Sequence, residues 1–259
     1  MAASFRPDFP LFLFRSFNAI KGIAHGVTTR HGGVSRGAYS SLNLSLSVQD
    51  DEAAVLENKR RVSEAFNVSP SSLLTTKQVH GAAVIEVTDD LWSIDDSPRA
   101  DALITDRPGP LLLQRFADCV PIFFAESQGR AVGLAHAGWR GTLLNVAAAT
   151  VAALEASYRT KPSDLVVGIG PSIGPCCFEV GTNVADQFHG SPNVIINRQP
   201  RPHVDLWEAN RLALMRVGVV PEAIEVARIC THCQKDDYFS HRALGYPAGR
   251  FGGVIGLTA

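Results

Sequence analysis

The sequence predicts a layered α+β fold, and three observations lead to that prediction. It contains many short apolar segments of strand length, it contains three longer helical segments, and the two kinds do not alternate strictly. A Rossmann sheet needs regular alternation, so we favour layers of sheet and helix. The 259 residues, 46% hydrophobic and 19% charged, have ordinary globular composition. No linker, long charge run or repeat divides the chain, so we expect a single domain over residues 1–259.

Three segments have the features of helices. The first begins at Asp50-Asp51-Glu52, where acidic side chains suit the positive end of a helix dipole, and it runs to about Phe66. The second, residues 142–158, is rich in alanine, the best helix former. The third starts at Asp205-Leu206-Trp207-Glu208, which resembles a capping box. The strands are expected at residues 24–28, 83–87, 102–105, 111–115, 121–125, 132–135, 165–168, 194–196 and 253–257.

Charge and hydropathy exclude several classes of partner. A formal net charge of −1, with a pI near 6.7, gives no reason to expect nucleic acid or an anionic membrane, and small-molecule substrates fit better. No stretch approaches the roughly 20 uninterrupted apolar residues of a membrane span. We therefore expect a soluble, cytoplasmic protein. The five cysteines are expected to be reduced thiols, and the oligomeric state stays open between monomer and homodimer.

Two histidines and a cysteine form a candidate metal site. They are His80 in Gln78-Val79-His80-Gly81, Cys119 in Ala117-Asp118-Cys119-Val120-Pro121, and His136 in Ala135-His136-Ala137-Gly138-Trp139. Imidazole and thiolate suit zinc, and three protein ligands leave a fourth position open for water or substrate, as in catalytic sites. Taken singly, a histidine or cysteine in such an apolar segment is more often a packed core residue than a metal ligand. Each, however, adjoins an apolar run, and sites usually assemble at strand ends.

Polar groups near these donors are candidates for substrate binding. Arg140 lies in a glycine-flanked turn that enters the alanine-rich helix, a place suited to an anion such as phosphate. Asp118, beside Cys119, could orient a ligand, hold a ribose hydroxyl or transfer a proton. Ordinary turns and surface ion pairs remain the competing interpretations. The other candidates for substrate or phosphate contacts are Arg30, Asn43, Lys77, Gln78, Ser240 and Arg242.

The remaining cysteines lie in two short motifs. Cys176 and Cys177 are neighbours and would point in different directions in an extended chain, which favours a pocket role for one and a core role for the other over a disulfide. Cys230-Thr231-His232-Cys233 has the CxxC spacing of redox and zinc sites. No second CxxC accompanies it, so we expect a structural role. The glycine-rich segment 168–179 lacks the lysine of a P-loop, so no nucleoside triphosphate site is predicted.

Together these motifs resemble one family, the YfiH-type proteins, variously labelled multicopper polyphenol oxidase (laccase), purine nucleoside phosphorylase and peptidoglycan editing factor. The resemblance runs from about His25 to Leu257. One departure is Ala243, where a second arginine commonly follows the Ser-aromatic-Arg motif. The matching segments are residues 25–30, 41–44, 78–81, 100–102, 117–121, 136–141, 170–171 and 239–242.

The resemblance implies a fold and a ligand set. It implies an α/β/β/α arrangement shared with cytotoxic-necrotizing-factor-like cysteine hydrolases, and metal ligation by His80, Cys119 and His136. The metal expected is Zn²⁺, with Cu²⁺ as an alternative.

The resemblance also implies an activity. The leading hypothesis is phosphorolysis of purine nucleosides, with Arg30, Arg140 and Arg242 holding phosphate, Asn43 or Asp118 positioning ribose, and adenosine deamination as a side activity. One alternative makes Cys119 a thiolate nucleophile activated by His136, acting on a cell-wall precursor. Another is copper-dependent phenol oxidation, which the small number of placed histidines disfavours. A non-enzymatic nucleotide sensor with a structural metal is the remaining possibility.

Overall fold

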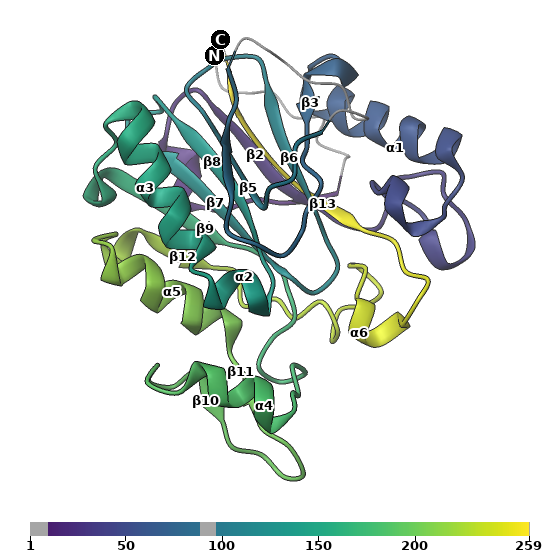
Figure 1. The fold of residues 1–259 in the computed structure, drawn as a ribbon. Coiled ribbons are helices and arrows are strands. Elements are labelled where there is room, and N and C mark those ends of the chain that lie inside the picture. The colour runs from purple at the N-terminus through teal and green to yellow at the C-terminus, as the bar shows by residue number, and fades with distance from the viewer. Residues whose placement is uncertain (1–9, 89–96, 259) are drawn as a thin grey trace.

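Two β-sheets pack face to face, and helices cover the outer face of each (Figure 1). The computed structural model describes residues 10–88 and 97–258. The first sheet has the order β1 (Leu11–Phe12), β2 (Ile23–Thr28), β13 (Phe251–Leu257), β6 (Leu111–Phe116) and β3 (Leu73–Leu74). The second has the order β12 (Ile224–Val226), β9 (Leu165–Ile169), β7 (Val120–Glu126), β8 (Val132–Ala137), β5 (Ala102–Thr105) and β4 (Val84–Glu86).

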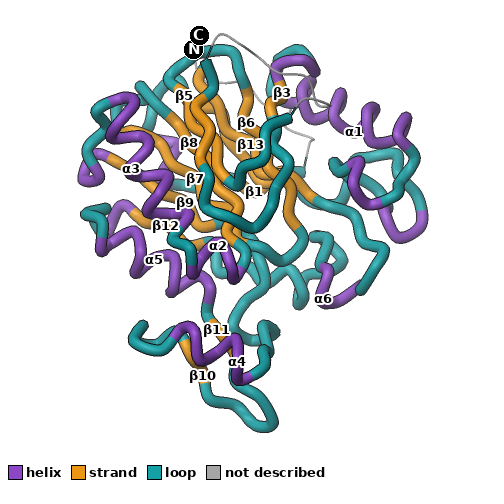
Figure 2. The backbone as a smooth tube through the Cα atoms, viewed as in Figure 1, coloured by secondary structure: helices purple, strands orange, loops and turns teal. Residues whose placement is uncertain are grey.

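The helices complete the α/β/β/α layers. Helix α1 (Glu52–Ala65) covers the first sheet, whereas α2 (Trp139–Leu143), α3 (Val146–Tyr158) and α5 (Leu206–Arg216) cover the second (Figure 2). A small lobe below α5 carries α4 (Thr182–Ala185) and the two-stranded ribbon of β10 (Ile195–Ile196) and β11 (His203–Val204). Helix α6 (His241–Leu244) lies just before β13. This mixed α+β single domain confirms the predicted fold class.

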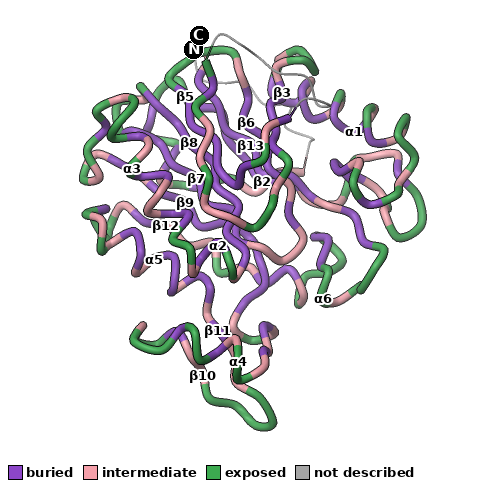
Figure 3. The backbone as a smooth tube through the Cα atoms, viewed as in Figure 1, coloured by how far each residue is buried: buried purple, intermediate pink, exposed green. Residues whose placement is uncertain are grey.

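Aromatic side chains fill the space between the sheets. Phe14, Phe116, Phe123 and Phe251 are almost completely buried there. Both sheets are largely buried, and the exposed backbone lies in the outer loops and helix surfaces (Figure 3). No helix in the described part of the chain is both long and apolar enough to span a bilayer.

The observed elements agree with most of the sequence-based ones. Each segment predicted as a strand overlaps an observed strand, and α1 and α5 lie where helices were expected. Asp205 caps α5 by accepting a hydrogen bond from the Glu208 amide, as its motif indicated. The helix expected over 142–158 is instead divided into α2 and α3. Asn145 adopts left-handed backbone angles (φ 59°) that asparagine tolerates, and the turn there ends α2.

A buried histidine in β2 makes the fold sensitive to acid. His25 Nε2 accepts a hydrogen bond from the Phe14 amide (2.9 Å), and its ring packs against Phe14 and Phe17. Burial lowers the pKa of His25 to about 4, outweighing the opposite effect of the Glu225 charge.

This histidine gives a prediction for the stability of the fold. Since the unfolded chain takes up the proton at higher pH than the folded one, about 3 kcal/mol of stability present above pH 6.5 should be lost as the pH falls toward 4. Urea unfolding of wild type and His25→Gln at several pH values measures this loss. If the free energy of unfolding of His25→Gln fell with decreasing pH as steeply as that of wild type, the prediction would be contradicted.

Candidate active site

Three side chains that could hold a metal ion meet at one end of the second sheet. The register of β7 and β8 pairs Val120 with Ala137 and Pro121 with His136, so Cys119, just before β7, lies beside His136. His80 comes from the loop after β3, and its ring lies 5.0 Å from that of His136. One imidazole nitrogen of each histidine and the thiol sulfur all lie within 4.8 Å of one another. The structure therefore brings together the three residues that the sequence singled out.

A buried carboxylate, Asp101, holds two of the three donors in place. It lies just before β5 and is completely buried. Its side chain accepts hydrogen bonds from the backbone amides of Val79 (3.1 Å), His80 (3.0 Å) and Gly81 (2.7 Å), and contacts His136 Nδ1 at 2.9 Å. With Nδ1 bonded to the carboxylate, Nε2 of His136 is the nitrogen that remains for a metal.

The backbone around the donors is compact and partly strained. His80 and Asp118 both have left-handed backbone angles, with φ of 60° and 86°. Such conformations are uncommon outside glycine and often occur at functional sites. Gly138 leaves room for the thiol, because a Cβ there would lie 2.9 Å from Cys119 Sγ and 3.1 Å from the His80 ring. The glycine after His136 is thus needed for close approach as well as for the turn into α2.

The donor group is electrostatically coupled. Burial opposes ionisation of Cys119, but the charges and hydrogen bonds of His136 and His80 outweigh it and lower the pKa of the thiol to about 6. Burial also opposes protonation of His136, whereas Cys119 and Asp101 raise its pKa to about 9. The Asp101 pKa is lowered, because hydrogen bonds from His136 and the Gly81 amide overcome its desolvation. These shifts favour a thiolate at Cys119, the form that both metal binding and nucleophilic attack require.

A cavity of about 700 Å³ opens beside the donors. This volume lies within the usual range for small-molecule sites. Its wall includes all three donors and a ring of polar and cationic side chains from separate parts of the chain. The lining residues are Ser45, Leu46, Ser47, Thr75, Thr76, Lys77, Gln78, His80, Ser97, Arg115, Ala117, Cys119, His136, His241 and Arg250.

Two neighbouring arginines, Arg115 and Arg250, form a cationic part of the cavity wall. Burial lowers the pKa of Arg115 to about 10, and the charge of Arg250 acts in the same direction. Burial likewise lowers the pKa of Arg250, against the opposite charges of Cys119 and Asp118. Two partly buried guanidinium groups that repel each other would be stabilised by an anion between them. The arrangement therefore suits a phosphate or another small anion.

Of the polar candidates named from the sequence, Lys77 and Gln78 line this cavity. Gln78 holds Arg115: its Oε1 accepts from the Arg115 amide and from Nε (both 3.2 Å), and its Nε2 donates to the Arg115 carbonyl (2.9 Å). Arg115 also donates from Nη2 to the Thr76 carbonyl at 2.6 Å. Gln78 thus orients a cation in the cavity wall.

Three further candidates make internal hydrogen bonds and do not line the cavity. Asn43 is completely buried, and its Oδ1 accepts a hydrogen bond from the Arg250 amide (2.9 Å). Asp118 accepts from the Thr231 hydroxyl (2.7 Å) and from the Arg242 amide (2.6 Å). Ser240 caps α6 by accepting from the Ala243 amide (3.1 Å). Asn43 and Asp118 therefore support residues that flank the cavity.

The three arginines expected to hold phosphate also lie outside the cavity wall. Arg30 donates to the carbonyls of Ser40 (2.9 Å) and Lys235 (2.8 Å) and stacks over Phe239. Arg140 is exposed and stacks over Trp139, 4.2 Å from the ring centre. Arg242 donates to the carbonyls of Cys177 (3.1 Å) and Glu179 (3.0 Å). The cavity instead takes its cations from Lys77, Arg115 and Arg250.

Sequence reasoning missed Asp101, Arg115 and Arg250 as site residues. Asp101 had a local signal, because it lies in a segment of the family resemblance and directly precedes a strand. Arg115 is within β6 and Arg250 directly precedes β13, and nothing in the spacing along the chain brings them together. Their proximity follows from the pairing of these two strands, in which Arg115 is opposite Gly252.

The donor set fits a borderline-soft divalent cation. Two imidazoles and one thiolate within 4.8 Å, with His136 held by a buried carboxylate, are typical of a catalytic zinc site. A multicopper centre fits poorly. Among the described residues, two groups of three or more side chains could hold a metal: this one and a group of four cysteines. The two groups together contain two histidines, whereas several copper ions would need many more.

Comparisons with known proteins match most of the chain. The family model "Multi-copper polyphenol oxidoreductase laccase" matches residues 24–258. The chain is 40% identical over 247 residues to "Purine nucleoside phosphorylase YlmD" of Geobacillus stearothermophilus, covering 91% of this chain and 90% of that protein. It is 35% identical over 226 residues to "Purine nucleoside phosphorylase YfiH" of Escherichia coli, covering 86% and 89%.

Solved structures show the same fold. The crystal structure of YlmD from Geobacillus stearothermophilus superposes with a TM-score of 0.91 at 37% sequence identity, covering 98% of this chain and 99% of that one. A Bacillus licheniformis protein described as YfiH gives a TM-score of 0.91 at 34% identity, with the same coverage.

Proposed function

Since this chain belongs to the YfiH and YlmD family of purine nucleoside phosphorylases, the laccase-domain family, we propose that it cleaves purine nucleosides with phosphate. Phosphate would attack the anomeric carbon of the ribose while the purine leaves, giving free base and ribose 1-phosphate. The observation that carries the proposal is the cavity that combines the His-Cys-His group with paired guanidinium groups. A volume of about 700 Å³ has room for a nucleoside and an anion.

We assign phosphate binding to Lys77, Arg115 and Arg250, in place of Arg30, Arg140 and Arg242. The first three line the cavity. Guanidinium groups match the oxygens of phosphate in a bidentate manner. The anion so held supplies the attacking oxygen, and its charge stabilises the positive charge that develops on the ribose ring.

His80, Cys119 and His136 would hold the metal, which we propose to be zinc. A zinc ion there would act as a Lewis acid and stabilise negative charge on the departing purine. Asp101 keeps His136 in the tautomer that leaves Nε2 for the metal. His241 is the remaining imidazole among the described lining residues, so we assign it the proton transfer expected of Asp118. Adenosine deamination is proposed as a side activity of the same cavity.

A second candidate function follows from the chain of contacts from Cys119 to His136 and from His136 to Asp101. A thiol with a lowered pKa, a histidine beside it and a carboxylate that orients the histidine are the components of a cysteine hydrolase. A thiolate that ligates a metal tightly is not free to attack. Hydrolysis of a cell-wall precursor that persists after complete removal of metal would favour this alternative.

The direct test of phosphorolysis is identification of the products from zinc-replete protein. Adenosine with phosphate is expected to give adenine and ribose 1-phosphate, and omission of phosphate is expected to stop adenine release. Mass spectrometry of the reaction mixture distinguishes the outcomes, with inosine indicating deamination. Adenine release that does not depend on phosphate would count against the proposal.

The two sets of arginines make opposite predictions for phosphate binding. Arg250→Gln removes a cation from the cavity wall and should raise the KM for phosphate about 10- to 100-fold, since hydrogen bonds to charged groups contribute about 1.5–3 kcal/mol. Arg140→Gln, at an exposed site, should change it less than about twofold. Steady-state kinetics with phosphate varied at saturating adenosine measures both. The reverse order of effects would return phosphate binding to Arg140 in the first turn of α2.

A further inference from the structure

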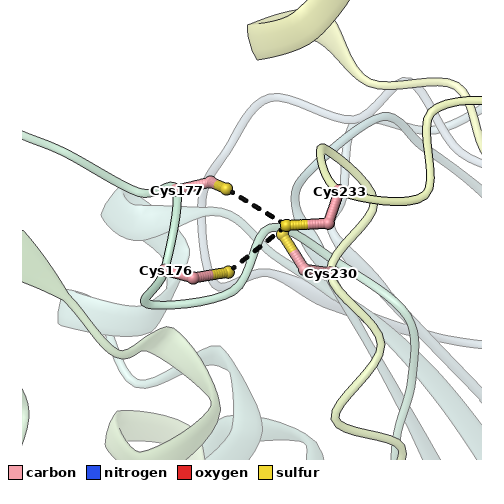
Figure 4. Close-up of side chains that lie close together, drawn as sticks. All are labelled: Cys176, Cys177, Cys230 and Cys233. Atoms are coloured by element: carbon pink, nitrogen blue, oxygen red, sulfur yellow. Dashed lines mark hydrogen bonds between the residues drawn. The ribbon is translucent and has the colours of Figure 1, made fainter.

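The remaining cysteines form a second cluster, well separated in sequence from the first donor group. Cys176 and Cys177 follow β9, and Cys230 and Cys233 follow β12. Their sulfur atoms all lie within 4.8 Å of one another. Figure 4 shows the two pairs reaching toward each other from separate loops. From this geometry we propose that Cys176, Cys177, Cys230 and Cys233 bind a structural zinc ion.

The spacing of the sulfurs fits four-coordinate zinc. Tetrahedral geometry with Zn–S bonds of about 2.3 Å places the sulfurs about 3.8 Å apart. Cys233 Sγ lies 3.7 Å from Cys176 Sγ and 3.4 Å from Cys177 Sγ (Figure 4). A disulfide would need about 2.05 Å and would join only two of the four. A set of four thiolates selects a soft or borderline cation, and zinc is the one that forms closed, four-thiolate structural sites.

Local turns aim both sulfurs of each pair to the same side. Gly174 accepts hydrogen bonds through its carbonyl from the amides of Cys177 (3.0 Å) and Phe178 (2.9 Å), so this segment is a turn. The expectation that Cys176 and Cys177 diverge assumed an extended chain, and the turn overrides it. In the second motif the Gln234 amide donates to the Cys230 carbonyl (2.9 Å), closing the CxxC turn. The Cys176-Cys177 pair therefore takes the place of the second CxxC that the sequence lacks.

Hydrogen bonds and charges around the cluster suit ligating thiolates. The Gly174 amide donates to Cys230 Sγ at 3.2 Å, and the Cys233 amide also bonds that sulfur. Backbone amides that donate to a ligating sulfur spread its negative charge. Two guanidinium groups lie beside the first pair, because Arg198 donates to the Cys176 carbonyl (3.4 Å) and Arg242 to the Cys177 carbonyl (3.1 Å). They offset the net charge of zinc with four thiolates.

The cluster connects loops that support the cavity. Thr231, between the two CxxC cysteines, donates to Asp118, which precedes Cys119. Arg242, bonded to Cys177, donates its amide to the same Asp118 carboxylate. A zinc ion would thus fix the segment before Cys119 and the start of α6, where His241 lines the cavity. This role is structural, and the proposed site does not depend on the proposed reaction.

Zinc content and coordination of the full chain test this proposal. Protein produced with excess zinc should hold about two zinc ions per chain, and X-ray absorption should show that sulfur makes up more than half of the average ligands. Cys233→Ser should keep about one zinc with mainly nitrogen and oxygen ligands. Cys119→Ser, the matched control, should keep about one zinc with an all-sulfur shell. Cys176→Ser should behave as Cys233→Ser does and serves if the latter fails to fold.

The stability of the same variants gives an independent readout. Loss of the four-sulfur zinc should lower Tm by about 5 °C or more, since a ligand that binds only the folded state stabilises it. A folded Cys233→Ser or Cys176→Ser protein that holds as much zinc as wild type would overturn the proposal. So would wild-type protein with one zinc per chain and about one sulfur ligand for each zinc, or an intact mass showing a disulfide within the cluster.

Discussion

Cys119→Ser is expected to lower kcat/KM for adenosine phosphorolysis by about 10³-fold. Metal-ion stabilisation of developing charge contributes several kcal/mol, and each 1.36 kcal/mol is a factor of ten in rate. Serine keeps the size of the side chain but is a poor ligand for zinc at neutral pH. Because the three donors act together, His80→Ala should cause a loss of the same order. Steady-state kinetics and zinc content, measured on the same samples, check the prediction.

Val79→Ala is the matched control for these variants. Val79 is next to His80 in the chain, but its side chain is exposed and offers no metal donor. It should retain activity within about twofold and hold as much zinc as wild type. Loss of activity in Cys119→Ser without loss of zinc would instead indicate a nucleophilic thiolate. Wild-type activity in Cys119→Ser would refute both mechanisms at this residue.

Asp101→Asn is expected to weaken zinc binding at the His-Cys-His group by about 10- to 100-fold, because carboxylates that orient metal-binding histidines have effects of this size. The carboxylate accepts three backbone N–H groups and contacts His136. An asparagine has one side-chain oxygen and an NH₂ group, so at least one buried donor would be left without an acceptor. Folding stability should therefore fall by about 1–3 kcal/mol as well.

The readouts for Asp101 separate positioning from general destabilisation. Zinc affinity is measured by competition with a chelator, and stability by urea unfolding with zinc in excess. Asp106→Asn is the control, since Asp106 follows the same strand and its side chain is 48% exposed. It should leave both quantities unchanged. An Asp101→Asn protein that is less stable but binds zinc normally would show that Asp101 supports only the fold.

The sequence predicted the layers of sheet and helix and singled out the three candidate metal ligands because their signals are local. Apolar runs of strand length bounded by turns identify the strands, and His80, Cys119 and His136 each adjoin such a run. The short strands β1, β3, β11 and β12 were missed, since two or three residues show no periodicity and these strands are defined only by their pairing with other strands. Helix α6, four residues long, gave no periodic signal either.

The cationic side of the cavity could not be inferred from local patterns. Arg140 lies in the first turn of α2 and looks suited to an anion, but its guanidinium stacks on Trp139 at the surface. Arg115 follows three leucines and a glutamine in β6, and nothing in that local pattern indicates a binding residue. The pairing of β6 with β13 brings it near Arg250, and Gln78 orients its guanidinium. The cysteine cluster has the same origin, because two turns far apart in sequence meet only in the folded chain.

The measurement that most directly tests the proposed reaction traces oxygen from phosphate. Zinc-replete wild-type protein would be incubated in ordinary water with adenosine and with phosphate whose four oxygens are all ¹⁸O. The mass of the sugar product would then be measured by mass spectrometry. Phosphorolysis predicts ribose 1-phosphate that keeps all the labelled oxygens, including the one bonded to the anomeric carbon, and formation of this product about 10³-fold more slowly by Cys119→Ser. Unlabelled free ribose, or equal product from both proteins, would contradict phosphorolysis at this site.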